Sequence, residues 1–332
     1  MSDAGQTCPP HYRYRPSVFR GEPSHCAETV YVIGGLYGNI EALHAIFRMQ
    51  ENEARAGRRV SLVFNGDFNW FNVDLQGFTE INAAVLAHVA IQGNVEAEIG
   101  APSDNGCGCN YPDYVDPTVV ARSNAIMREL QSIAADAPGI RGALEALPMV
   151  RTIQVGDARI GIVHGDAEAL AGWAFAAECL GAPRQCAVSD TVAIETTPIE
   201  KIATFFREAD VCAFASTHTC LPLARDFAVD GAPHLVINSG AAGMPNFARS
   251  TFGVITRISI EPAVPRGSLY GIEIGGVRFD ALPVHYDQRA WVEAFLRNWH
   301  PGSPAHASYF DRIVSGPRFD VSNAIGGHVR LA

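Results

Sequence analysis

Four side chains of the types that bind metal ions each follow a short apolar run of the sequence. They are Asp67, Asn94, His164 and His218. Apolar runs rich in β-branched residues and followed by glycine or polar residues are typical of buried strands. Strands of an α/β sheet end at a common edge, where loops from several strands can meet. We therefore expect these side chains to converge at the edge of an α/β sheet.

The chemistry of this set suits a transition-metal ion. One carboxylate, one amide oxygen and two imidazoles form a mixed nitrogen and oxygen set for Mn²⁺, Fe²⁺ or Zn²⁺, with positions left for water or substrate. Asp and Asn also cap turns where no metal is present. The repeated placement directly after a strand favours a shared site over unrelated caps. We therefore predict one divalent metal ion per chain.

Alternating strand and helix patterns near the start of the chain predict the βαβ units that would position these residues. The strands are expected over 29–34, 60–64 and 88–92, and the helices over 40–56 and 73–86. Asp67 and Asn94 follow the second and third strands. A loop rich in Gly, Asp, Asn and Pro at 101–116 predicts an ordered flap.

The rest of the chain predicts further strands around the two histidines. Segments 149–155 and 159–163 are expected to form a hairpin, and 211–215 a strand. Residues 197–200 read Thr-Pro-Ile-Glu, a capping box that predicts a helix to about residue 208. The other expected elements are helices over 117–135, 289–297 and 305–313, and strands over 252–260, 270–274 and 277–282.

Composition excludes several classes of protein. The chain has 332 residues, 48% of them apolar, enough for a full core, and a formal net charge of -10 without clustered Lys or Arg. A nucleic-acid surface is not expected. No apolar run approaches the ~20 residues of a membrane helix, and the N-terminus lacks a secretory signal pattern. We expect a cytoplasmic protein with a small-molecule substrate; the oligomeric state stays open.

Several short motifs occur in a fixed order along the chain. They read G-L-Y-G-N at 35–39, G-D-F-N-W at 66–70, G-N-V-E at 93–96, H-G-D at 164–166, T-H-T-C at 217–220 and N-S-G-A-A-G-M-P at 238–245. In this order they resemble the calcineurin-like metallophosphoesterase family, whose motifs are D-x-H-G-N, G-D-x-x-D, G-N-H-D/E, a lone His, G-H-x-H and N-P-G-S-x-G-x-P.

This resemblance implies an α/β fold, an αββα sandwich of two mixed sheets flanked by helices, with a C-terminal β-rich extension. The expected domains are an N-terminal arm over 1–28, a metallophosphoesterase-like domain over 29–245, and strands and helices over 246–332 that complete or cover the core.

The resemblance also implies a two-metal centre of which only one half is kept. The ligands of one family metal correspond here to Gly35, Tyr37, Asp67 and Cys220. The ligands of the other metal correspond to Asp67, Asn94, His164 and His218, all intact. Random decay of an unused site should damage both halves. The chain is thus predicted to be a divergent member with a single metal site, in which Asp67, Asn94 and His164 also serve catalysis.

The replaced residues suggest specific roles. Without a carboxylate at Gly35, free backbone N–H groups of Gly35, Gly38 and Asn39 at a helix start could bind a phosphate or carboxylate; Gly35 could instead serve only a turn. Tyr37 packs in the core or donates to a substrate oxygen in catalysis. Cys220 is a possible thiolate ligand for Zn²⁺ or Fe²⁺, or a buried inert thiol.

Other replacements weaken the case for phosphate ester chemistry. Val95 stands where the family has a histidine, and valine cannot donate a proton. Cysteines in a chain of this length are expected to be mostly free thiols. If Cys107 and Cys109 of the flap approached Cys220, three thiols near one metal would favour thiolate or redox chemistry.

The sequence therefore supports three hypotheses for function. The first is a metal-dependent hydrolase of a small phosphate ester or a related substrate, acting with one ion. The second is a single-metal Fe or Zn enzyme of non-phosphatase chemistry that involves Cys220 or Tyr37. The third is a non-catalytic, metal-dependent binding protein on the same fold.

Overall fold

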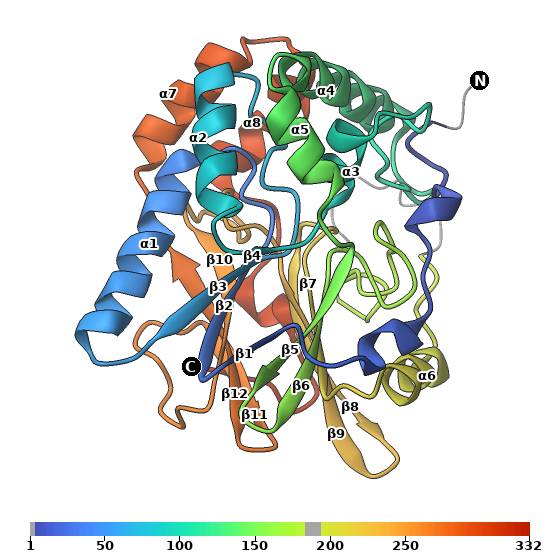
Figure 1. The fold of residues 1–332 in the computed structure, drawn as a ribbon, viewed down its shortest axis with the longest axis vertical. Coiled ribbons are helices and arrows are strands. Elements are labelled where there is room, and N and C mark those ends of the chain that lie inside the picture. Colours follow the sequence, from blue (N-terminus) through green and yellow to red (C-terminus); the bar gives the residue numbers. More distant parts are fainter. Residues whose placement is uncertain (1–3, 183–193) are drawn as a thin grey trace.

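Two mixed sheets form the centre of the molecule. The computed structural model describes residues 4–182 and 194–332, and Cys186 lies outside them. Each sheet has seven strands among the described residues, and helices lie along the outside (Figure 1). The predicted α/β sandwich of two mixed sheets flanked by helices is confirmed.

Sheet 1 has the strand order β14-β11-β12-β10-β2-β3-β4. Its parallel part is β2 (Thr29–Ile33), β3 (Val60–Phe64) and β4 (Val89–Ala90). Its antiparallel part is β10 (Gly253–Ser259), β12 (Val277–Val284), β11 (Tyr270–Ile274) and β14 (Arg330–Leu331). β10 pairs directly with β2, so the C-terminal strands extend the sheet that the first βαβ units begin.

Sheet 2 has the order β1-β5-β6-β7-β9-β8-β13. The predicted hairpin is β5 (Val150–Val155) with β6 (Ala158–Val163), and β6 runs parallel to β7 (Ala213–Ser216). The remaining strands are β1 (His25–Ala27), β8 (Pro222–Val229), β9 (Ala232–Ser239) and β13 (Ile325–Gly326). The carboxyl ends of β6 and β7 lie side by side, because the two strands are parallel neighbours.

The helices follow the sequence pattern closely at the long elements. They are α1 (Ile40–Arg55), α2 (Leu75–Val85), α3 (Asn94–Gly100), α4 (Pro117–Ala135), α5 (Pro138–Glu145), α6 (Ile199–Ala209), α7 (Gln288–Asn298) and α8 (Pro304–Ser315). Short 3₁₀ turns are η1 (Pro10–Tyr12), η2 (Pro16–Arg20) and η3 (Val321–Ala324).

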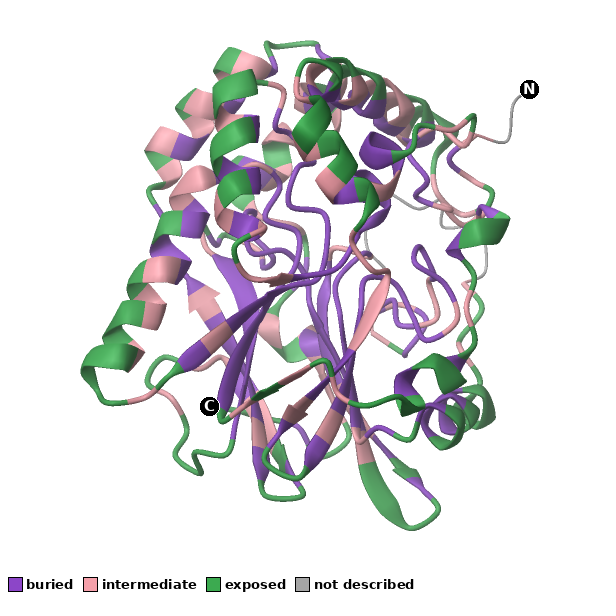
Figure 2. Ribbon diagram, viewed as in Figure 1, coloured by how far each residue is buried: buried purple, intermediate pink, exposed green. Residues whose placement is uncertain are grey.

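The alternation of side chains along β2 explains how the core has two parts. Val30 and Val32 belong to the hydrophobic cluster shared with sheet 2, whereas Tyr31 and Ile33 belong to the cluster shared with the helices over sheet 1. Successive side chains of a strand point to opposite faces, so a strand buried on both faces is apolar throughout. Figure 2 shows these central strands buried and the outward sides of the helices exposed.

Several sequence expectations need correction. The prediction of a capping box at the start of α6 is wrong. This helix has no side-chain cap, and the Thr197 hydroxyl donates to the carbonyl of Ala174 instead. The helices α3 and α5 were not predicted, because they are short, with seven and eight residues. The strand expected over 88–92 is reduced to β4.

The predicted N-terminal arm packs against the rest of the molecule. Phe19 is fully buried, and its ring packs edge-on against Phe214 with 5.4 Å between ring centroids. Its carbonyl accepts a hydrogen bond of 2.8 Å from Arg159. The Tyr12 hydroxyl donates to Glu98 at 2.9 Å, and β1 pairs with β5 at the edge of sheet 2. The arm is thus part of the folded core.

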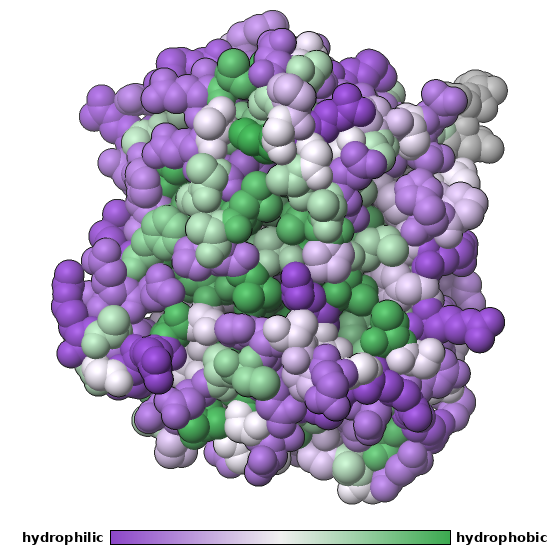
Figure 3. Space-filling view, viewed as in Figure 1, coloured by the Kyte–Doolittle hydropathy of each residue, from purple (hydrophilic) through white to green (hydrophobic). Residues whose placement is uncertain are grey.

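The described helices were compared with the length and apolar character of membrane-spanning helices. Among the described residues, no helix combines the length and the apolar character needed to cross a bilayer. Figure 3 shows hydrophobic residues gathered near the middle of one face, with hydrophilic residues around them.

We predict that Phe19→Ala lowers the free energy of unfolding by about 3 to 5 kcal/mol, because it leaves a cavity against Phe214. Urea unfolding followed by circular dichroism measures this change. Val18, which is 50% exposed, provides the control, and Val18→Ala should change stability by less than about 0.5 kcal/mol. Equal effects of the two substitutions would show that the arm is not packed as described.

Candidate metal centre

The predicted ligands come together from both sheets. Asp67 and Asn94 follow the strands β3 and β4 of sheet 1, and His164 and His218 follow β6 and β7 of sheet 2. The site therefore lies where the carboxyl edges of the two sheets meet, and not at the edge of one sheet as the sequence suggested. All four residues are buried.

The Nε2 atom of His164 is the centre of the group. It lies 3.0 Å from Oδ1 of Asn94, 3.3 Å from Oδ1 of Asp67 and 3.1 Å from Nδ1 of His218. Ligand atoms about 2.1 Å from one ion lie about 3.0 to 3.4 Å apart at octahedral and tetrahedral angles. The three separations from His164 Nε2 fall in this range, and the ligand atoms of Asp67, His164 and His218 all lie within 4.8 Å of one another.

Hydrogen bonds on the far side of each imidazole fix which nitrogen faces the site. Nδ1–H of His164 donates to the carbonyl of Asn65 at 2.9 Å, and Nε2–H of His218 donates to the carbonyl of Cys109 at 3.1 Å. In the neutral rings, the lone pairs of His164 Nε2 and His218 Nδ1 then face each other. Such carbonyl partners are typical of metal-binding histidines, and the donor set fits a divalent ion.

The two histidines differ in their electrostatics. Burial opposes the charged form of His164, but the adjacent Asp67 carboxylate and its hydrogen bond outweigh this effect and raise the pKa of His164. Burial lowers the pKa of His218 to about 3, helped by the nearby His164. His218 is therefore neutral at physiological pH.

Glu96 holds the loop that carries Asp67. Its fully buried carboxylate accepts backbone N–H groups, at 2.7 to 3.3 Å, from Asp67, Phe68, Asn69 and Gly93. Burial and the charge of Asp67 raise the pKa of Glu96 to about 7, against the opposite effect of these amide bonds. Glu96 is the last residue of the G-N-V-E motif, and no role was predicted for it from the sequence.

Close approach of the backbone to the ligands explains why residue 93 is a glycine. A side chain at Gly93 would place its Cβ 2.3 Å from Oδ1 of Asp67 and 2.9 Å from His164. Asp67 itself has φ 56°, in the left-handed region that non-glycine residues seldom adopt. Strained backbone of this kind is concentrated at functional sites, where surrounding contacts maintain it.

Tyr37 and Cys220 fill the other half of the site. The Tyr37 hydroxyl and the Cys220 sulfur lie 2.8 Å apart. A Cβ added at Gly35 would lie 2.9 Å from Cζ of Tyr37, so the phenol ring occupies the space beside Gly35. Both Tyr37 and Cys220 have left-handed backbone, with φ of 57° and 64°. The space where a second metal would lie therefore contains a phenol and a thiol.

Cys220 does not join the ligand group. The atoms of Asp67, His164 and His218 lie within 4.8 Å of one another, and no Cys belongs to such a group among the described residues. Burial raises the pKa of the Cys220 thiol, so the protonated form is favoured. The prediction of Cys220 as a metal ligand is not supported by this geometry.

The predicted anion cradle is not available at the start of α1. The backbone N–H groups of Gly35, Gly38 and Asn39 already donate to carbonyl groups, those of Gly66, Phe68 and Leu36 respectively. The Asn39 side chain caps α1. Substrate binding by Gly35, Gly38 and Asn39 stays a prediction, and the hydrogen bonds of their N–H groups do not favour it.

The predicted flap covers the centre. Cys107 and Cys109 form a disulfide, so the hypothesis of three thiols near one metal is wrong. The Cys107 carbonyl accepts from the Asn94 amide at 2.8 Å. The Cys109 carbonyl accepts from His218 and, at 3.1 Å, from the indole N–H of Trp173. The flap thus orients two of the four ligands. The other described cysteines are free, as expected.

Two further residues were missed by sequence reasoning. The ring of Trp173 lies 5.3 Å from that of His218, and Arg312 of α8 donates to the Cys220 carbonyl at 2.6 Å. Neither belongs to a sequence motif, and no signal in the sequence linked them to the site. The role of Glu96 could have been predicted, because an acidic residue occurs three positions after Gly93.

Comparisons with known proteins identify related folds. No family model and no curated protein matches the chain. Among solved structures, a hypothetical protein from Pyrococcus horikoshii OT3 has a TM-score of 0.55 and 15% identity, covering 87% of this chain and 99% of that chain. A metallophosphoesterase from Sphaerobacter thermophilus has a TM-score of 0.46 and 17% identity, covering 82% of this chain and 93% of that chain.

Zinc-bound Vps29 from Entamoeba histolytica is also similar, with a TM-score of 0.32 and 13% identity, covering 77% of this chain and 99% of that chain. The likeness to the Pyrococcus horikoshii protein is one of fold. With its two mixed sheets and flanking helices, the chain has the sandwich architecture that its motifs predict.

We predict that Glu96→Gln destabilises the protein by about 2 to 3 kcal/mol, because the new amide nitrogen cannot accept backbone N–H groups. Displacement of Asp67 should also weaken Mn²⁺ binding by about tenfold. Urea unfolding and calorimetric titration measure the two effects. Glu129→Gln on the exposed side of α4 is the matched control. Unchanged Mn²⁺ affinity in a folded Glu96→Gln protein would contradict the role given to Glu96.

Proposed function

We propose that the chain is a metal-dependent hydrolase of a small phosphate ester or a related small molecule, acting with a single ion. The observation that supports this proposal most is that His164 Nε2 lies 3.0 to 3.3 Å from Asn94 Oδ1, His218 Nδ1 and Asp67 Oδ1. Asp67, Asn94, His164 and His218 would hold the ion. When bound, such an ion binds an oxyanion and lowers the pKa of a bound water.

The protein's own residues supply orientation more than proton transfer. Asn65 and Cys109 fix the tautomers of the two histidines, and Glu96 fixes the Asp67 loop. Preorganised ligands of this kind need no rearrangement when charge develops on the substrate. The flap and Trp173 contact His218, and the side chain of Asp67 is 9% exposed.

The absence of a proton donor at position 95 restricts the substrate. Val95 is buried, with 1% of its surface exposed, and a valine cannot protonate a leaving oxygen. Esters whose leaving group is already a weak base need no such donor. Within this proposal, aryl phosphates are therefore better substrates than alkyl phosphates.

Tyr37 offers a second candidate function. Its hydroxyl and the Cys220 thiol lie in contact beside the ligand group, which favours the alternative of an Fe or Zn enzyme with non-phosphatase chemistry. Binding of a metal by Cys220 would require the thiol to lose its proton and leave Tyr37. A metal–thiolate absorption band that disappears in Cys220→Ser would support this alternative.

We predict hydrolysis of p-nitrophenyl phosphate or bis(p-nitrophenyl) phosphate by the protein loaded with Mn²⁺, Fe²⁺ or Zn²⁺. Asp67→Ala should lower kcat/KM by at least about 100-fold, because a ligand of the ion is removed. The exposed residue Asp136 provides the control Asp136→Asn. Full metal binding with no cleavage of either ester would favour the hypothesis of a non-catalytic binding protein. Unchanged metal content in Asp67→Ala would contradict every hypothesis in which Asp67 binds the ion.

We predict one equivalent of metal per chain by elemental analysis. The double variant Tyr37→His, Cys220→His should bind a second equivalent, because it places two imidazoles beside Asp67 in the space that the phenol and the thiol now fill. Tyr37→Phe and Cys220→Ser separately should keep one equivalent. Two equivalents in the unaltered protein would contradict the single-metal proposal.

A further inference from the structure

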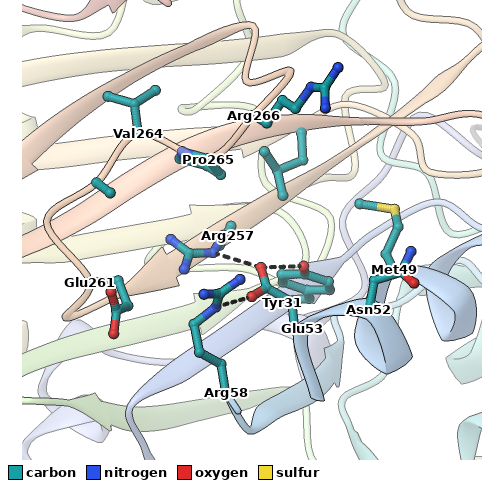
Figure 4. Close-up of a pocket in the computed structure, with 12 residues that line it drawn as sticks. Tyr31, Met49, Asn52, Glu53, Arg58, Arg257, Glu261, Val264, Pro265 and Arg266 are labelled. Atoms are coloured by element: carbon teal, nitrogen blue, oxygen red, sulfur yellow. Dashed lines mark hydrogen bonds and ion pairs between the residues drawn. The ribbon is translucent and has the colours of Figure 1, made fainter. Parts of the chain in front are cut away.

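A hollow on the outer side of sheet 1 lies away from the metal centre. It has a volume of about 400 Å³ and is lined by the end of α1, by the middle of β10 and by the loop at 263–266. Figure 4 shows Arg58, Arg257 and Tyr31 gathered around Glu53, with Val264 and Pro265 on the opposite side. The metal ligands follow the carboxyl ends of the strands and line no part of this hollow.

Arg257 is the unusual residue of the hollow. Only 3% of its surface is exposed, yet its Nε and Nη1 atoms have no hydrogen-bond partner within residues 4–182 and 194–332. Its ion-pair contact is with Glu53, at 3.5 Å between Nε and Oε1. Buried guanidinium groups are normally paired and hydrogen-bonded. Asp280 is the cross-strand partner of Arg257 and interacts with it electrostatically, but no described residue accepts a hydrogen bond from Nε or Nη1.

Glu53 alone cannot supply such an acceptor. Its carboxylate already forms an ion pair with Arg58 and accepts from the Tyr31 hydroxyl at 3.2 Å. The charged residues lining the hollow are three arginines and two glutamates, which leave one positive charge in excess. They are Arg58, Arg257, Arg266, Glu53 and Glu261. The whole chain carries a net charge of -10, so this local excess is opposite in sign.

The other wall of the hollow is apolar. Met49, Val264, Pro265 and Leu282 line it, and the side chain of Val264 is 53% exposed. A neighbouring hollow of about 400 Å³ shares Met49, Asn52, Arg266 and Leu282 with the first. Together they form a trough with apolar walls and with arginines along its length, because the second hollow adds Arg48. Small-molecule sites commonly combine apolar walls with a few placed polar groups, at volumes of ~300 to 1,000 Å³.

We propose that this trough binds a small amphipathic anion, with its carboxylate or phosphate group on Arg257 and Arg266 and its apolar part along Val264 and Leu282. The anionic group provides the acceptor that the Arg257 guanidinium lacks. Arginine is suited to this role, because its planar donors match the oxygens of carboxylate and phosphate. Binding here does not depend on the metal centre or on the function proposed for it.

The competing explanation is that these charges only hold α1 against sheet 1. In that case Arg257 and Glu53 stabilise the fold, and no ligand is bound. The two explanations differ at Arg266 and Glu261, which are exposed residues of the loop outside the Tyr31–Glu53–Arg58 network. Changes at these two positions should affect a bound anion and leave the fold intact.

Calorimetric titration of the full chain with octanoate and with octyl phosphate tests the proposal. At least one should bind, more tightly than 1-octanol, which lacks the charge, and than inorganic phosphate, which lacks the apolar part. Whichever of the two acids binds more tightly identifies the preferred head group. Arg266→Gln should weaken binding by about fivefold to tenfold, and Glu261→Gln, which removes a like charge, should tighten it.

Arg289→Gln, an exposed arginine of α7 outside the trough, should leave binding unchanged. Arg257→Met should abolish binding if the variant folds. If it does not fold, Arg266→Gln and Glu261→Gln test whether the trough binds the anion. Failure of both acids to bind would overturn the proposal. Equal binding of 1-octanol, or an unchanged affinity in Arg266→Gln, would overturn it as well.

Discussion

The candidate metal centre depends on the bonds between the Glu96 carboxylate and the backbone of two loops. One buried carboxylate accepts N–H groups from three successive residues of the Asp67 loop and from Gly93. These bonds keep Asp67 in the left-handed region, which costs roughly 1 to 3 kcal/mol for a non-glycine residue. Because Glu96 belongs to α3, whose first residue is Asn94, the same element carries one ligand and positions another.

Tyr37 and Cys220 fill the space where the resemblance predicts the lost metal position. Tyr37 lies over Gly35 and contacts Cys220, and burial favours the uncharged forms of both residues by raising their pKa. Two neutral groups in contact need no cation between them. Two histidines and a carboxylate, in contrast, leave lone pairs directed at one point. The two halves of the centre therefore differ in charge and in their need for an ion.

Segments from distant parts of the chain complete the site. The flap supplies carbonyl groups to Asn94 and His218, and Arg312, in the C-terminal helix α8, binds the Cys220 carbonyl. The strands of the C-terminal third extend sheet 1 from β2, and the N-terminal arm packs Phe19 into sheet 2. The ends of the chain thus support the frame in which the ligands are held.

The sequence by itself predicted several strands, the long helices and the four candidate ligands. Strand and helix patterns arise from neighbouring residues, and a ligand directly after a strand is a local feature, so Asp67, Asn94, His164 and His218 could be read without a structure. Only the tertiary structure decided that they join two sheets, that Tyr37 contacts Cys220, and that flap carbonyls orient the ligands. It also showed that the backbone N–H groups of Gly35, Gly38 and Asn39 already donate to carbonyl groups. These contacts join residues far apart in sequence, whose partners depend on packing, and no local pattern encodes them.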